Sequence, residues 1–240
     1  MAKTDYERYL NTETLLSLQK PADDLVCHDE LQFQVVHQVA ELWMKLFLHE
    51  VFHVKKLLKE ERLIEAHVLF ERGHWILHLL GQQLRLLNTM SPSEYHKVRT
   101  QLGKGSGQES PGFNQILEEA PKLWPEFEGL LKKRGVAVAE LHENPERYPD
   151  LFILAEDFFS IDEQFLNFRY LHLQLVKRII GGDVPSLKGV HAEKYLTYGL
   201  QNQFFPELWE VRNEISRRRG IPIGAKSGLC PFPHHNSDER

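Results

Sequence analysis

The chain has 240 residues, 42% of them hydrophobic, and is therefore long enough to bury the core of one domain. Its net charge of -5 argues against a general binder of nucleic acids or acidic membranes, which usually carry a basic excess. Two cysteines, Cys27 and Cys230, form no CxxC pair, so we expect neither a zinc ribbon nor a disulfide framework. No stretch approaches the length of a membrane span, and we expect a cytoplasmic protein.

Helical periodicity dominates the first half of the chain. Helices are expected at residues 11–19, 29–59 and 62–88. A further helix is expected to begin after Ser91, because serine, proline and glutamate follow one another there as N-cap, first helical residue and capping-box partner.

The second half begins after a glycine-rich loop at residues 103–112. Its helices are expected at residues 114–134, 150–180, 191–203 and 204–219. Prolines at 121 and 125 predict a break in the first of these helices, and a weak strand pattern occurs at residues 135–139. The sequence therefore predicts an all-α helical bundle, with a single domain over residues 1–220 and an extended tail over 221–240.

The segment at residues 28–50 combines an apolar helical face with three histidines, His28, His37 and His49. Histidine is the side chain that most readily serves as a metal or haem ligand, or as an acid or base near neutral pH. The segment therefore predicts the wall of a functional site.

Part of this segment matches the zinc motif HExxH, with His49, Glu50 and His53. No third ligand follows at the usual spacing, and the strand that flanks such zinc clefts is missing. We therefore interpret both histidines as members of a partly solvated face, and keep a zinc hydrolase as an alternative.

Two other groups could also bind a metal. His74 and His78 lie one helical turn apart, with Glu71 a turn earlier, but packing is the simpler interpretation. Cys230 with the following His234 and His235 forms a weak candidate in the tail.

Tyr95 and Arg99 are four residues apart and share a helix face. An arginine binds a carboxylate through two parallel hydrogen bonds, and a neighbouring phenol adds a third donor. The pair suits the carboxylate of an amino acid, although an exposed arginine beside a half-buried tyrosine would look the same. His172, among aromatic and aliphatic neighbours, suits either a haem ligand or a core histidine.

Taken together, these segments resemble the tryptophan 2,3-dioxygenase family of haem enzymes. The resemblance covers residues 6–10, the LLSLQ segment, residues 28–50, SPSEY with Arg99, the helix around His172, and FFPELWEVR at residues 204–212. It touches both ends of the chain in the family's order, and implies an all-α bundle that encloses haem b.

The resemblance also implies roles for individual residues. His172 would be the proximal ligand of the haem iron, and His37 would be the catalytic distal histidine near the ring nitrogen of the substrate. Phe33 would line the substrate pocket, and Tyr95 with Arg99 would bind the substrate carboxylate.

Three residues near the start of the chain, Tyr6, Tyr9 and Leu10, would reach into the site of a neighbouring subunit. This role implies self-association into a dimer or, as in tetrameric family members, a homotetramer.

The implied reaction is oxidation of L-tryptophan or a substituted tryptophan by O₂, with both oxygen atoms inserted across the indole 2,3-bond. Three departures from the family fall at the expected pocket rim: a different loop at residues 182–189, a longer loop at 103–113, and a shorter region between residues 113 and 157. Relatives on this scaffold include haem monooxygenases, so insertion of one oxygen atom is the alternative. A haem-binding sensor without turnover is a third possibility.

Overall fold

The computed structural model describes residues 3–103, 105, 107–182 and 192–221. All regular elements among these residues are α-helices or short 3-10 helices, so the predicted all-α fold is confirmed. No helix in the described part of the chain is both long and apolar enough to cross a membrane.

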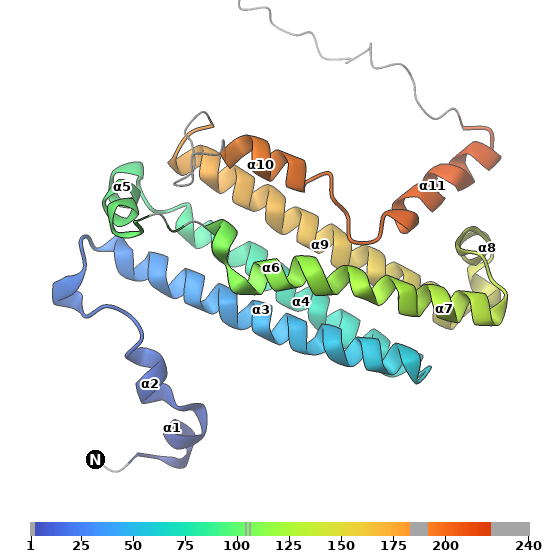
Figure 1. Cartoon of the computed structure of the whole chain (residues 1–240), viewed down its shortest axis with the longest axis horizontal. Helices are drawn as coiled ribbons and strands as arrows, with labels where there is room; N and C mark the ends of the chain where they lie inside the picture. Colours follow the sequence, from blue (N-terminus) through green and yellow to red (C-terminus); the bar gives the residue numbers. More distant parts are fainter. Residues whose placement is uncertain (1–2, 104, 106, 183–191, 222–240) are drawn as a thin grey trace, which may run out of the picture.

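Three long helices form the body of the molecule. They are α3 (Asp29–Lys59), α4 (Leu63–Leu87) and α9 (Pro149–Ile179), and all three were predicted within one or two residues. Helix α4 packs extensively against both α3 and α9, and the three run along the long axis of the molecule (Figure 1). Their apolar faces bury a core in which Phe47, Phe158 and Phe165 are fully enclosed.

A further row of helices runs alongside α3 (Figure 1). It consists of α6 (Pro111–Glu119), the 3-10 helix η3 (Ala120–Leu123) and α7 (Trp124–Arg134). The switch to 3-10 geometry contains Pro121 and precedes Pro125, which confirms the predicted break. A proline removes one backbone donor and crowds the preceding turn, so the α-helix is interrupted there.

The N-cap predicted at Ser91 is confirmed. Its hydroxyl accepts a hydrogen bond from the backbone N–H of Glu94 at 3.2 Å, and α5 (Pro92–Gln101) follows. The Glu94 carboxylate binds Lys97 at 2.6 Å, which differs from its predicted role as capping-box partner.

The helix expected at residues 11–19 is present but shorter: it is α2 (Thr12–Leu16), preceded by Asn11 in the left-handed conformation with φ 52°. The short helix before it, α1 (Asp5–Leu10), was not predicted. The weak strand pattern at residues 135–139 runs into a short helix, α8 (Val138–Glu143), which packs against α9 and α11. Packing has overridden a local preference that is weak in any case.

The remaining elements are η1 (Ala22–Asp24), η2 (Gly107–Glu109), η4 (Pro145–Arg147), α10 (Ala192–Gly199) and α11 (Pro206–Arg218). Residues 222–240 of the predicted tail, which include Cys230, His234 and His235, lie outside the described residues, and so do residues 183–189 of the altered loop.

The start of α11 is fixed by one buried carboxylate on α9, that of Asp162. It accepts hydrogen bonds from the backbone N–H groups of Phe204 and Phe205 at 2.8 and 3.1 Å, and from the indole N–H of Trp209 at 2.9 Å. Burial raises the pKa of Asp162, and these donors oppose that rise. The FFPELW segment is thereby held on α9, directly after the stretch at residues 196–202 that borders the candidate site.

Candidate functional site

A cavity of about 510 Å³ lies between α3, α4, α6, α9 and residues 196–202. Its apolar wall includes Val36, Met44, Leu84, Leu87, Phe113, Leu117, Phe168 and Leu175. Sites for small molecules and cofactors typically have such a volume and a mainly apolar lining with a few polar groups. The cavity is therefore the candidate functional site.

Two histidines from distant parts of the sequence line this cavity: His37 on α3 and His172 on α9. Burial, with a smaller contribution from the nearby His37, lowers the pKa of His172 to about 4. The ring of His172 stacks on Phe168, with ring centroids 6.3 Å apart and planes inclined by 15°. His172 is therefore neutral at physiological pH, which is the form of imidazole that binds a metal.

The second imidazole, that of His37, has a defined protonation pattern. Its Nδ1 lies 2.7 Å from the backbone oxygen of Phe33, and since a carbonyl oxygen can only accept, Nδ1 carries the hydrogen. Burial lowers the pKa of His37, although the residue is still exposed, so the ring is neutral near pH 7. Its Nε2 must then carry a lone pair and act as a hydrogen-bond acceptor.

Three further predicted residues gather around His37. The ring of Phe33 lies 4.0 Å from that of His37 and 6.3 Å from that of Tyr95 on α5. Burial raises the pKa of Tyr95, and the positive charge of Arg99, one turn later, opposes the rise. Phe33, His37, Tyr95 and Arg99 therefore form one group next to the cavity, and of these four His37 lines it.

The predicted residues of α1 lie elsewhere. Tyr6, Tyr9 and Leu10 are 70%, 90% and 44% exposed, and α1 and α2 stand apart from the helical bundle (Figure 1). The structure does not bring these three side chains to the cavity of their own chain. Their exposure leaves them available to another molecule.

Sequence reasoning missed two polar residues of the cavity, Gln83 on α4 and Arg169 on α9. Both amide atoms of Gln83 are buried without a hydrogen-bond partner among the described residues. Arg169 precedes His172 by three residues and binds the backbone oxygen of Asn202 at 2.9 Å. A buried amide without partners indicates that the cavity accommodates a group with polar atoms as well as an apolar body.

A third missed feature joins α3 to the start of α6. The Glu41 carboxylate accepts hydrogen bonds from the hydroxyl of Ser110 and, at 3.0 Å, from the backbone N–H of Gly112. A Cβ atom on Gly112 would lie 2.7 Å from Glu41 Oε2 and 2.8 Å from Met44 Cβ, so this close approach requires glycine. The glycines of the GKGSGQESPGF segment are the sequence signal that could have indicated it.

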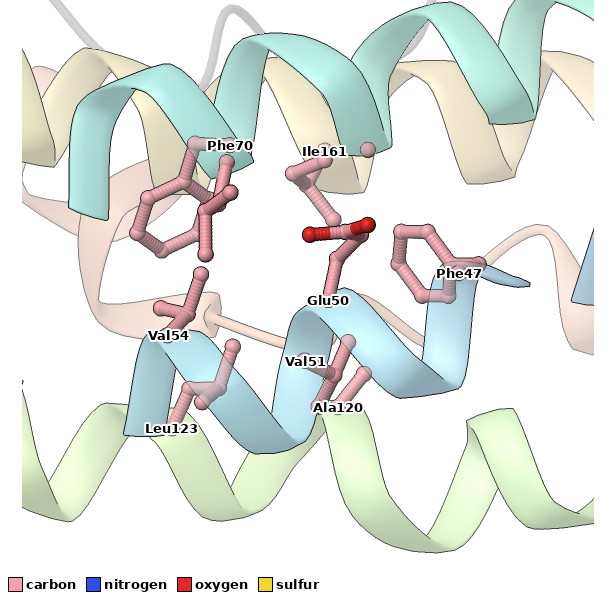
Figure 2. Close-up of a pocket in the computed structure, with 10 residues that line it drawn as sticks. Phe47, Glu50, Val51, Val54, Phe70, Ala120, Leu123 and Ile161 are labelled. Atoms are coloured by element: carbon pink, nitrogen blue, oxygen red, sulfur yellow. The ribbon is translucent and has the colours of Figure 1, made fainter. Parts of the chain in front are cut away.

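The HExxH pattern is not a metal site. Figure 2 shows the Glu50 side chain directed into the core between α3 and α4, towards Ile161. Its carboxylate binds Arg72 at 2.9 Å, with 5% of the side chain exposed, while His49 and His53 are exposed on another face. The three side chains do not converge, which confirms that the histidines lie on a solvated face.

The pair His74 and His78 also has a packing role. Both rings meet the largely exposed ring of Trp75 edge-on, with centroids at 6.1 and 5.6 Å. Glu71 belongs to a different group on the same helix, with His67.

Comparison with known proteins agrees with this arrangement. The model of the tryptophan 2,3-dioxygenase family matches residues 1–120. A tryptophan 2,3-dioxygenase of Serratia proteamaculans is 30% identical, and the match covers 89% of this chain and 94% of the relative. Enzymes of the same name from Caulobacter vibrioides and Pseudomonas fluorescens are also 30% identical; each match covers 88% of this chain, and 98% and 91% of the relative, respectively. The chain therefore belongs to the tryptophan 2,3-dioxygenase family.

Proposed function

We propose that this protein is a haem b-dependent oxygenase that inserts both atoms of O₂ across the indole 2,3-bond of L-tryptophan. The product is of the N-formylkynurenine type. The observation that carries this proposal is the pair of neutral imidazoles, His37 and His172, on one large cavity of a tryptophan 2,3-dioxygenase family member.

The cavity fits a haem group. His172 would hold the iron through its neutral imidazole, and the apolar wall would surround the apolar body of the group. Gln83 and Arg169 supply polar atoms for the charged edge of the group. When bound, haem supplies a ferrous iron at which O₂ is activated.

Three residues around His37 suit the amino-acid substrate. The guanidinium of Arg99 would bind the carboxylate through two parallel hydrogen bonds, and the phenol of Tyr95, which burial keeps protonated, would donate a third. The ring of Phe33 offers a flat apolar surface to the indole. Together they hold the substrate in one orientation, which lowers the entropic part of the barrier.

His37 has a specific role in this arrangement. Its Nε2 lone pair would accept the hydrogen of the indole N–H, while the bond from Nδ1 to the Phe33 oxygen prevents the ring from turning. The imidazole thereby orients the indole and can take up a proton at Nε2.

Helix α1 would complete the site of a second subunit in a dimer or tetramer. The exposure of Tyr6, Tyr9 and Leu10 on one short helix supports this part of the proposal, since apolar side chains that gather on an exposed element are typical of an interaction surface.

The deciding experiment is product analysis with isotopically labelled oxygen. Haem-loaded protein, a reductant, ¹⁸O₂ and L-tryptophan should give a product that contains two labelled atoms, with L-tyrosine as the control substrate. One labelled atom would indicate a monooxygenase, and tryptophan binding without product would indicate a sensor; either result would overturn the proposal.

A further inference from the structure

Outside the cavity, three side chains with metal-binding chemistry meet between α4 and α9. They are His67 and Glu71 on α4 and Asp157 on α9. Each offers one ligand atom, and these atoms all lie within 4.8 Å of one another. His67 and Glu71 are four residues apart and so share the helix face that borders α9.

The burial of the three side chains is graded. The Asp157 side chain is 7% exposed and that of His67 is 38% exposed, while Glu71 lies at the surface. The Nδ1 atom of His67 lies 2.8 Å from Asp157 Oδ2. The cluster therefore has a fixed inner ligand, a half-buried imidazole and an outer carboxylate that can adjust its position.

The electrostatics of the cluster favour a cation. Burial raises the pKa of Asp157 to about 6, with smaller contributions from the carboxylates of Glu71 and Glu156, while the hydrogen bond and charge of His67 oppose the rise. Two nearby guanidinium groups are engaged with other carboxylates: Arg72 with Glu50 at 2.9 Å and Arg212 with Glu156 at 2.8 Å.

We propose that His67, Glu71 and Asp157 bind a divalent transition-metal cation, with Zn²⁺ as the best match. An imidazole nitrogen and carboxylate oxygens are both among the ligands that Zn²⁺ accepts, and with three protein ligands a water molecule would complete the tetrahedron. Zinc-to-ligand distances of about 2.0–2.2 Å place neighbouring ligand atoms roughly 3.4 Å apart. His67 Nδ1 and Asp157 Oδ2 lie 2.8 Å apart, and all three ligand atoms lie within 4.8 Å of one another. Side-chain rotations, chiefly of the exposed Glu71, would bring them to the spacing that zinc requires.

The bound metal would brace α4 against α9. Since neither histidine of the cavity belongs to the cluster, the site is separate from the proposed oxygenase chemistry, and it does not rest on that proposal. A metal that binds the folded chain but not the unfolded chain stabilises the fold. Zinc at about 100 times its Kd should therefore raise Tm by roughly 5–10 °C.

The test uses the full chain loaded with haem, so that His37 and His172 are not free to bind zinc. After treatment with a chelator, the protein is titrated with ZnCl₂ and followed by calorimetry, metal analysis and thermal unfolding. We expect one zinc per chain. The variant Glu71→Gln, at an exposed position, should weaken binding at least about tenfold, and His67→Gln should abolish it.

Matched controls are available on α4 and on its neighbour α3. Glu65→Gln changes another exposed glutamate of α4, and His53→Gln changes an exposed histidine of α3; both should bind zinc as the unaltered chain does. No stoichiometric zinc on the unaltered chain, or equal affinity in Glu71→Gln, would overturn the proposal. Tryptophan oxygenation should be the same with and without zinc, so the two proposals can fail independently.

Discussion

The two halves of α3 carry similar chemical groups with different outcomes. In the first half, His37 and Glu41 lie one turn apart and both border the cavity of about 510 Å³. In the second half, His49 and Glu50 are adjacent, so they point about 100° apart around the helix. Glu50 consequently enters the core while His49 meets solvent.

The space around each half explains the difference further. The carboxylate of Glu50 borders a void of about 10 Å³, lined by Phe47, Phe70, Ile161 and other apolar side chains, which is room for one water molecule at most. The comparison teaches that residue type and spacing identify candidates on a helix. Neighbouring helices decide which of them face a space large enough for chemistry.

The largest effect should come from the cavity. His172→Ala removes the proposed iron ligand, and we expect loss of stoichiometric haem and of turnover. Absorbance in the Soret region after purification measures the haem content. Normal haem binding by a folded variant would show that another residue holds the iron and that the role assigned to the cavity is wrong.

A large-to-small substitution in the packed core, by contrast, should affect stability. Phe158 is fully buried against Phe70 and Phe127, and Phe158→Ala should lower the free energy of unfolding by about 3–5 kcal/mol. Denaturant unfolding at low temperature measures this loss. As long as it remains folded, the variant should still bind haem. Loss of haem from the folded variant would contradict the separation between the cavity and the packed core.

Arg99→Lys tests the proposed binding of the substrate carboxylate next to the cavity. Lysine keeps the charge but loses the two parallel hydrogen bonds, and a hydrogen bond to a charged group contributes about 1.5–3 kcal/mol. We therefore expect KM for tryptophan to rise roughly 10–100-fold with unchanged haem content. An unchanged KM in steady-state kinetics would argue for a different carboxylate ligand.

His37→Ala should have a smaller effect, because it removes one hydrogen bond between neutral groups worth about 0.5–1.5 kcal/mol. We expect kcat to fall up to roughly tenfold. Since burial lowers the pKa of His37, the acceptor form is present at neutral and alkaline pH and is lost on acidification. The acid limb of the kcat profile should therefore lie below the usual histidine pKa, and it should disappear in the alanine variant.

The smallest effect is expected at His49, the exposed histidine in the second half of α3. His49→Ala should change the free energy of unfolding by less than about 0.5 kcal/mol and leave haem content and turnover unchanged. Thermal unfolding measures the stability, Soret absorbance the haem content, and the oxygenase assay the turnover. A large loss of activity would mean that the HExxH segment has a role that its exposure does not indicate.

The sequence predicted the long helices well, because an apolar stripe that continues over 31 residues of α3 leaves few alternatives. It predicted less at α1, α2 and α8, where short segments depend on a single left-handed residue or on packing. His37 and His172 could be proposed from resemblance, but their meeting in one cavity depends on how α3 and α9 pack. Gln83 could not be found at all, because two adjacent glutamines, Gln82 and Gln83, give no sign of which one faces a cavity.

The contact of Gly112 with α3 limits how this protein can be redesigned. Any side chain at that position would collide with Glu41 and Met44, so α6 would have to move outward and the cavity would change shape as a whole. Leu117 and Phe113 line the same wall without this constraint. Directed evolution towards bulkier indoles should therefore accumulate changes at these two positions and keep glycine at 112.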